Sequence, residues 1–192
     1  IRAEESDKAI IVGHDWGGAI AWSFAASHPQ MTDKLIIVNL PHIACLVREL
    51  MKENSAQHKS SAYARMFQRE ESHKALSAQM LAGIVAPKSP ELKQKYIEAF
   101  ERSSFESMMN YYRCNYPREP YQLPQLPKIE VPVLQFHGLQ DSALLPSALN
   151  QTWDYLNQDW TLVTLPGVGH WAHQQAADKV TDTMLWWLRM RR

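Results

Sequence analysis

The sequence predicts an α/β fold in which a parallel sheet is interrupted by a helical insertion. Three observations carry this prediction. Residues 1–40 contain two short apolar runs separated by a helical pattern, residues 41–128 have helical spacing without a convincing strand, and the strand and helix pattern returns from residue 129. We therefore predict a core formed by residues 1–40 and 129–192, and a helical lid formed by residues 41–128.

The core is predicted to open with a strand, a tight turn, a helix and a second strand. The apolar run Ala9–Val12 leads into Gly13-His14-Asp15-Trp16-Gly17-Gly18, and an Ala-rich stretch follows to His28. Pro29 predicts the end of that helix, and Leu35–Leu40 is a second apolar run of strand length. Continuous apolar strands are typical of a parallel sheet that is covered on both faces.

The predicted lid contains one clear helix start. Ser89-Pro90-Glu91 combines a good N-cap residue with a proline in the first turn, and Leu92, Tyr96 and Phe100 then recur at helical spacing. Five prolines within residues 117–132 predict an extended connector back to the core.

The second part of the core repeats the strand and helix pattern. We expect a strand at Val133–His137, a polar turn through Asp141, a helix near Ser147–Leu156 and a strand at Thr161–Leu165. An amphipathic helix that carries Val180, Met184, Leu185, Trp187 and Leu188 is then expected to end the chain.

Composition excludes several classes of partner. The 192 residues include 20 basic and 20 acidic side chains, so the chain lacks the positive field of a typical nucleic-acid-binding protein. It has no apolar run of about 18 residues that could cross a membrane. Two cysteines, Cys45 and Cys114, cannot form a disulfide framework, and no signal peptide opens the chain, so we expect a cytoplasmic protein.

The strongest chemical signal is the turn from Gly13 to Gly18. A nucleophile on a sharp strand-to-helix turn needs small neighbours, and the following helix offers free backbone N–H groups. The nucleophile position of this turn holds Asp15. A phosphate-binding or purely structural turn is the alternative for such a pattern in isolation.

Two later residues favour the catalytic interpretation. Asp141 follows one predicted strand and His170 follows the next, and the carboxyl ends of parallel strands meet at the same edge of a sheet. Nucleophile, acid and base therefore occur in the order Asp15, Asp141, His170. The spacing of His137, His170 and His173 with Asp141 matches no usual metal site, so we expect neither a metal nor a cofactor.

These motifs resemble one branch of the α/β hydrolases. Gly-His-Asp-Trp-Gly-Gly, Gly-Leu-Gln-Asp and Gly-His-Trp are similar to the soluble epoxide hydrolases, with the haloalkane dehalogenases close by. The segments Ser61–Gln68 and Asn110–Arg113 resemble those that carry the two epoxide-activating tyrosines of that family. The resemblance thus assigns proton donation to Tyr63 and Tyr112.

The resemblance implies a hydrolase that converts a small apolar epoxide and water into a vicinal diol. Asp15 would form an alkyl ester with the epoxide, because a carboxylate that attacked an ester or amide would give a reactive anhydride. Water activated by the His170 and Asp141 pair would then hydrolyse the ester, while the backbone N–H of Trp16 holds the oxyanion.

Other interpretations stay open from the sequence. A haloalkane dehalogenase is one, although the predicted lid contains no tryptophan to hold a halide, and the tyrosines could simply pack between helices. The resemblance also implies N-terminal strands that this sequence lacks. The chain could therefore be an inactive fragment, and the strand at Ala9–Val12 would need pairing from a missing N-terminal segment or a second copy.

Overall fold

The computed structural model describes residues 1–87 and 89–191. It forms two compact units: a core unit, Ile1–Ser60 with Pro120–Arg192, and a helical unit, Ser61–Glu119. Lys88 and Arg192, which belong to the predicted lid and the predicted core, lie outside the described residues.

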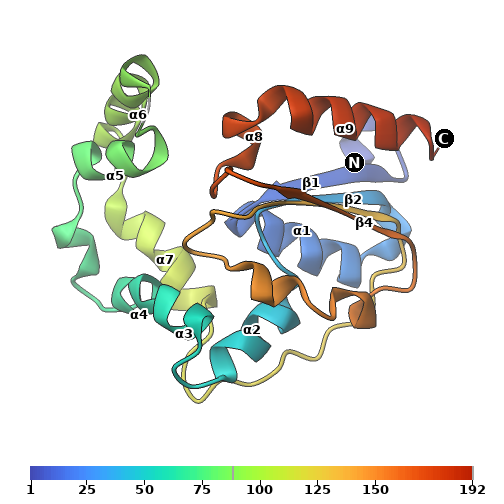
Figure 1. Cartoon of the computed structure of the whole chain (residues 1–192), viewed down its shortest axis with the longest axis horizontal. Coiled ribbons are helices and arrows are strands. Elements are labelled where there is room, and N and C mark those ends of the chain that lie inside the picture. The colour runs from blue at the N-terminus through green and yellow to red at the C-terminus, as the bar shows by residue number, and fades with distance from the viewer. Residues whose placement is uncertain (88, 192) are drawn as a thin grey trace. The chain divides into compact units, whose positions relative to one another are not determined.

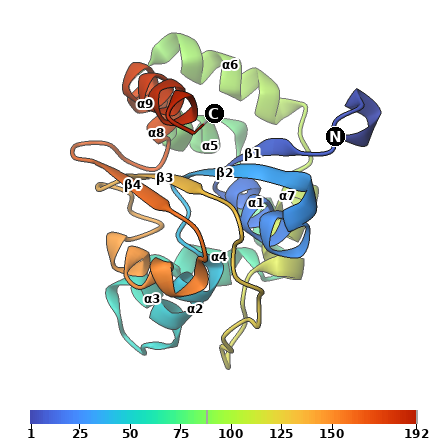
Figure 2. The same cartoon turned by 90° about the vertical axis from the view of Figure 1, so that its right-hand side faces the viewer.

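The core unit contains a four-stranded sheet in which every neighbouring pair of strands is parallel. The predicted parallel α/β fold is confirmed, and Figure 2 shows the strands side by side in the order β1-β2-β3-β4. Their bounds are β1 Ala9–His14, β2 Thr32–Val38, β3 Val133–Gly138 and β4 Trp160–Leu165. All four predicted strands are present, within a few residues of the predicted bounds.

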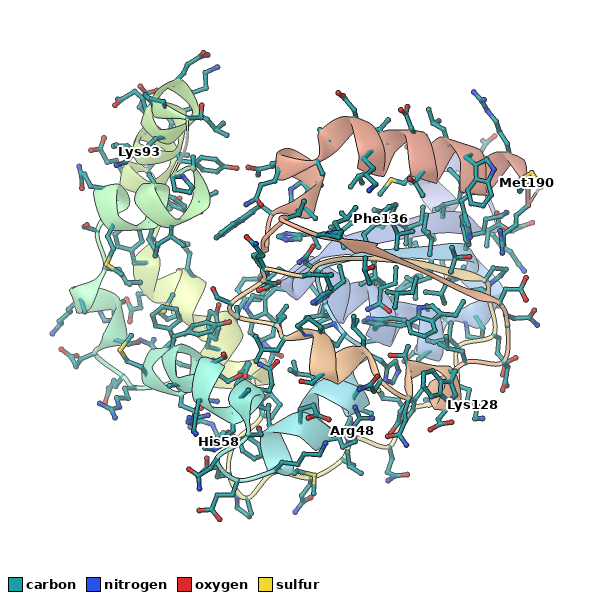
Figure 3. The ribbon with its side chains drawn as sticks, in the orientation of Figure 1. Arg48, His58, Lys93, Lys128, Phe136 and Met190 are labelled. Atoms are coloured by element: carbon teal, nitrogen blue, oxygen red, sulfur yellow. The ribbon has the colours of Figure 1, made fainter. Side chains whose placement is uncertain are left out.

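Helices cover both faces of this sheet. Helix α1 (Trp16–Ser27) packs on one face, and α8 (Ala172–Gln175) and α9 (Ala177–Arg189) pack on the other (Figure 1). Phe136, labelled in Figure 3, belongs to a buried cluster with Val180 and Trp187 of α9. The predicted amphipathic helix at the end of the chain is therefore confirmed, because its apolar side completes the core.

The core unit extends beyond the predicted residues 1–40. Helix α2 (Ile43–Met51) packs against the short 3₁₀ helix η4 (Pro146–Leu149), and α3 (Ala56–Ser60) packs against α2. Both helices fall within the predicted lid. Helix α2 buries Cys45, Val47 and Leu50 against the core, which explains why it belongs to the core unit.

The prediction of a helix near Ser147–Leu156 is wrong. Two short 3₁₀ helices, η4 and η5 (Thr152–Tyr155), occupy this segment instead. The chain is extended at Asn150 and left-handed at Gln151, where φ is 60°, and these conformations interrupt a continuous helix.

The helical unit consists of short helices. They are α4 (Ala62–Phe67), the 3₁₀ helix η3 (Ser72–Ala75), α5 (Ala78–Val85), α6 (Pro90–Glu101) and α7 (Phe105–Asn115). The predicted start of α6 is confirmed, because the Ser89 side chain accepts a hydrogen bond from the backbone N–H of Leu92. Helices α5 and α6 lie side by side (Figure 1).

Two further predictions concern the whole chain. Among the residues that the structure describes, no helix is both long and apolar enough to cross a membrane. Cys45 is buried, Cys114 is exposed, and both are free thiols, so no disulfide joins them.

Candidate active site

Asp15 lies on a strained turn between β1 and α1. Its φ of 50° and ψ of −123° place it in a conformation that residues with a side chain rarely adopt. A Cβ on Gly13 would overlap the backbone carbonyl of Gly17, and a Cβ on Gly18 would lie 3.1 Å from the Leu40 side chain. Glycine is therefore required at residue 13 for this turn to close, and the turn presents Asp15 at the start of α1.

The structure brings Asp15, Asp141 and His170 together at the carboxyl edge of the sheet. His170 Nδ1 lies 2.8 Å from Asp141 Oδ2, and His170 Nε2 lies 3.3 Å from Asp15 Oδ1. Asp141 is 2% exposed on the turn after β3, and His170 is on the loop after β4. One imidazole thus bridges two carboxylates that are 126 residues apart in the sequence.

The contacts within this trio set its charges. Burial raises the pKa of Asp15, but hydrogen bonds from His170 and from the backbone N–H of Trp16 outweigh burial, so the pKa lies below its ordinary value. Burial also raises the pKa of Asp141, but the hydrogen bond to His170 and the charge of His170 outweigh burial, so this pKa too lies below its ordinary value. Burial lowers the pKa of His170, yet its bonds to the two carboxylates raise it to about 9. The resting site therefore holds an imidazolium between two carboxylates.

The sequence matches a known family over most of its length. A family model for the alpha/beta hydrolase fold matches residues 5–177. The chain belongs to the alpha/beta hydrolase family.

Within this family, the chain is similar in sequence to proteins named as epoxide hydrolases. The chain is 30% identical to epoxide hydrolase 1 of Caenorhabditis elegans, over 92% of this chain and 46% of that protein. It is 25% identical to epoxide hydrolase 3 of Xenopus tropicalis, over 94% of this chain and 52% of that protein. This alpha/beta hydrolase chain therefore spans about half the length of these curated relatives.

A solved structure supports the same comparison. An epoxide hydrolase from Bacillus megaterium, crystallised with an inhibitor, superposes with a TM-score of 0.87 at 26% identity. The match covers 98% of this chain and 72% of that one. The chain is thus similar to epoxide hydrolases in both sequence and fold.

Asn39 belongs to this alpha/beta hydrolase site, although sequence reasoning missed it. Its side-chain amide donates to Asp141 Oδ2 at 3.0 Å and to the carbonyl of Gly169 at 3.2 Å. Its side-chain oxygen accepts from the backbone N–H of Gly138. The available signal was a lone polar residue within the apolar run Leu35–Leu40.

Two further sets of hydrogen bonds hold the turn that carries Asp141: bonds to its own backbone N–H groups and bonds to the Gln57 side chain. Asp141 Oδ1 accepts from the backbone N–H groups of Ala143 and Leu144, at 2.9 and 3.0 Å. The buried Gln57 side chain on α3 donates to the carbonyl of Ala143 and accepts from the N–H of Leu145. Gln57 had no recognisable signal in the sequence, because it is one of many glutamines in a polar helical stretch.

Neutral histidines surround His170 in this alpha/beta hydrolase. His14 Nε2 bonds to the backbone carbonyl of His170 at 3.0 Å, and its ring lies 4.7 Å from the His170 ring and 4.5 Å from the His173 ring. Burial lowers the pKa of His14 to about 4 and also lowers that of His173. The Trp171 ring meets the His170 ring edge-on. His14 and Trp171 thus both contact the His170 ring.

The two candidate tyrosines lie together in the helical unit. The rings of Tyr63 on α4 and Tyr112 on α7 meet edge-on with centroids 6.1 Å apart, and both rings contact Phe67. Gln68 donates to the backbone carbonyls of Tyr112 and Tyr116, which ties α4 to the end of α7. Two phenols separated by 49 residues are thereby held as a pair.

Residues 1–87 and 89–191 contain no group of three or more His, Cys, Asp or Glu side chains arranged to hold a metal ion. The trio Asp15, His170 and Asp141 places a carboxylate next to an imidazole that a second carboxylate supports.

Proposed function

We propose that this chain carries the catalytic core of an epoxide hydrolase, which converts a small apolar epoxide and water into a vicinal diol. One observation carries the proposal. The residue on the strained turn is an aspartate whose Oδ1 lies 3.3 Å from Nε2 of an acid-supported histidine. A carboxylate at this position favours attack on an sp³ carbon over attack on an acyl group, because the alkyl ester product can still be hydrolysed.

In the first step, a carboxylate oxygen of Asp15 attacks one epoxide carbon. The new ester C–O bond forms as the ring C–O bond breaks, and the ring oxygen leaves as an alkoxide on the neighbouring carbon. We assign the proton for that oxygen to Tyr63 and Tyr112, since phenols of pKa about 10 are acidic enough to protonate an alkoxide. The lowered pKa of Asp15 keeps its carboxylate ionised for this step.

In the second step, His170 acts as a general base. Once Asp15 is an ester it carries no charge, so His170 loses one of the two carboxylates that raise its pKa to about 9. The pKa of His170 then falls toward the ordinary range, and the imidazolium releases its proton through solvent to the tyrosinate that the first step left. The neutral imidazole can then accept a proton from water. Asp141 remains bonded to Nδ1 and keeps Nε2 directed at the water.

The hydroxide equivalent then attacks the carbonyl carbon of the Asp15 ester. The resulting oxyanion would be stabilised by the backbone N–H of Trp16, which already bonds to the Asp15 carboxylate. Collapse of this intermediate releases the diol and regenerates the Asp15 carboxylate, so one oxygen of each diol comes from the protein in a single turnover.

The partners of the complete protein are part of this proposal. Edge strand β1 leaves Ile10 and Val12 exposed at 41% and 56%, and a parallel sheet is normally covered on both faces and at its edges. We assign pairing with β1 to a further segment of the protein or to a second copy of the chain. The similar epoxide hydrolases, which are longer than this chain, support the first of these.

The test is to trap the ester. The His170→Gln variant is incubated with styrene oxide, digested and analysed by mass spectrometry. We expect the peptide that contains Asp15 to gain the mass of the epoxide, because formation of the ester needs Asp15 while its hydrolysis needs His170. His28→Gln is the matched control, since His28 is exposed, and this variant should accumulate no adduct. An adduct-free Asp15 peptide from folded His170→Gln protein contradicts the proposal.

A further inference from the structure

Asn39 is buried in an unusual backbone conformation directly after β2. It is 0% exposed, and its φ of 46° lies in the left-handed region, which asparagine tolerates better than most residues with a side chain. This conformation ends the strand and turns the Asn39 side chain across the carboxyl edge of the sheet. A buried polar residue in an uncommon backbone conformation at that edge suggests a role in the neighbouring site.

The amide of Asn39 joins two loops that come from different strands. Its nitrogen donates to Asp141, on the turn after β3, and to the carbonyl of Gly169, on the loop after β4. Its oxygen accepts from Gly138, the last residue of β3. The Asp141 oxygen that Asn39 contacts is Oδ2, which is the same atom that bonds to His170 Nδ1.

We propose that Asn39 is a positioning residue that holds the turn of Asp141 and the loop of His170 in register, so that Asp141 Oδ2 stays bonded to His170 Nδ1. The proposal rests on the proposed roles of Asp141 and His170. Without the amide, Oδ2 loses one of its two donors and the carbonyl next to His170 loses its partner. The carboxylate would then be held mainly through Oδ1, by Ala143 and Leu144, and could rotate away from the imidazole.

The charge around His170 does not change when Asn39 is removed, because the amide is neutral. The ionisable groups that act on His170 or on its partner Asp141 come from β1, β3 and the loops and helix after the strands. They are Asp15, Asp141, His14, His137 and His173. A neutral substitution at residue 39 that alters the titration of His170 therefore reports a change in geometry.

The experiment is an NMR titration of histidine-labelled protein with Asn39→Gly. Glycine accepts the left-handed conformation, so this variant removes the amide without adding backbone strain. We expect the titration midpoint of His170 to fall by about one pH unit and the low-field resonance of its Nδ1 proton to weaken. The His170 resonances are assigned by their absence from His170→Gln. Asn54→Gly is the matched control, because Asn54 has a φ of 59° but is exposed, and it should change neither signal.

An unchanged His170 midpoint in folded Asn39→Gly protein overturns the proposal. A second variant, Asn39→Asp, keeps the size of the side chain but cannot donate to Asp141 or to the carbonyl of Gly169, so the low-field resonance of the His170 Nδ1 proton should again weaken. This variant decides the question if Asn39→Gly does not fold, since an unchanged Nδ1 resonance overturns the proposal. The titration needs no turnover, whereas the trapping of the Asp15 ester tests the proposed function, so the two can fail separately.

Discussion

The two units of the molecule hold their candidate functional residues in different ways. In the core unit, Asp141 is 2% exposed, and its carboxylate bonds to His170, Asn39 and two backbone N–H groups. In the helical unit, Tyr63 and Tyr112 meet through ring contacts that they share with Phe67. Hydrogen bonds converge on the Asp141 carboxylate in the first group, whereas the two tyrosine rings of the second group pack edge-on and Gln68 ties their helices together.

The two units also differ in how deeply their helices and strands are buried. Strands β2 and β3 are almost wholly buried, whereas α6 contains no buried residue and α7 buries only Met109. Regions with few buried apolar contacts open at a lower free energy than the central strands of a sheet. We therefore expect the helices of the helical unit to unfold locally at a lower free energy than the strands of the core unit.

The largest expected effect is the loss of the proposed nucleophile, Asp15, in the core unit. In the complete enzyme, Asp15→Asn should lower kcat by about 10⁴-fold or more, because no covalent step can occur without the carboxylate. Asparagine has nearly the same size and shape as aspartate, so the loss should not come from misfolding. Steady-state diol formation is the measurement, and Asp7→Asn, at an exposed site, is the control. Full turnover by Asp15→Asn would place the nucleophile elsewhere.

Removal of the two phenols of the helical unit should have a smaller effect. Tyr63→Phe with Tyr112→Phe keeps the ring cluster but removes both proposed proton donors, and we expect kcat to fall by about 10² to 10⁴-fold. Tyr96→Phe is the control, since Tyr96 stacks on Phe100 within α6. The mechanism also predicts that ester formation slows while ester hydrolysis does not, which single-turnover kinetics can separate. Unchanged ester formation would leave these tyrosines with a packing role only.

The two units should differ in stability. All seven tryptophans lie in the core unit, so fluorescence reports its unfolding alone, whereas circular dichroism reports both units. We expect the dichroism to begin to change at a lower urea concentration than the fluorescence. Leu134→Ala, at a fully buried position of β3, should cost about 2 to 5 kcal/mol and shift the fluorescence transition. Ile97→Ala in α6 should shift only the early dichroism change, and coincident transitions would show that the units unfold together.

Acid should destabilise the core unit through its buried neutral histidines. Burial lowers the pKa of His42 to about 4, so the unfolded chain binds a proton more readily than the folded one. Stability from this group is complete above pH 6.5 and is lost as the pH falls through 4, by up to about 3 kcal/mol. Urea midpoints at pH 7 and pH 4.5 should therefore differ less in His42→Asn than in the unsubstituted protein. His28→Asn should leave the difference unchanged.

His170 gives the opposite pH dependence. Its pKa is raised to about 9, so its contribution to stability is complete below pH 6.5 and is lost as the pH rises through 9. Urea midpoints between pH 7 and pH 9.5 should thus fall, and His170→Gln should flatten this fall. An equally steep fall in that variant would assign the alkaline loss to other groups.

The smallest expected effect concerns the exposed edge of the core unit. Val12→Lys should change the free energy of unfolding by less than about 0.5 kcal/mol, because Val12 is more than half exposed. It should reduce self-association of the chain, since lysine on an edge strand discourages pairing with another strand. Sedimentation velocity measures this, and Ile20→Lys on α1 is the control, as Ile20 is exposed at 59% away from the strand. Equal effects of both variants would indicate general solubility rather than strand pairing.

The sequence predicted those features whose causes are local. Glycines around Asp15, continuous apolar strands and the Ser89 cap each depend on a few neighbouring residues, and all three patterns match the structure. The helix expected near Ser147–Leu156 failed, because helical composition there did not indicate the left-handed conformation at Gln151. Apolar spacing alone therefore did not distinguish one continuous helix from two short 3₁₀ helices in this segment.

The sequence by itself determined the sheet, the sharp turn at Asp15 and the chain order of Asp15, Asp141 and His170. Parallel strands place their carboxyl ends at one edge, so this order was enough to predict that the three residues share a crevice. Only the tertiary structure decided which neutral residues hold them there. Asn39 and Gln57 act through hydrogen bonds to residues 86 to 130 positions away, and no local pattern records a partner at that distance.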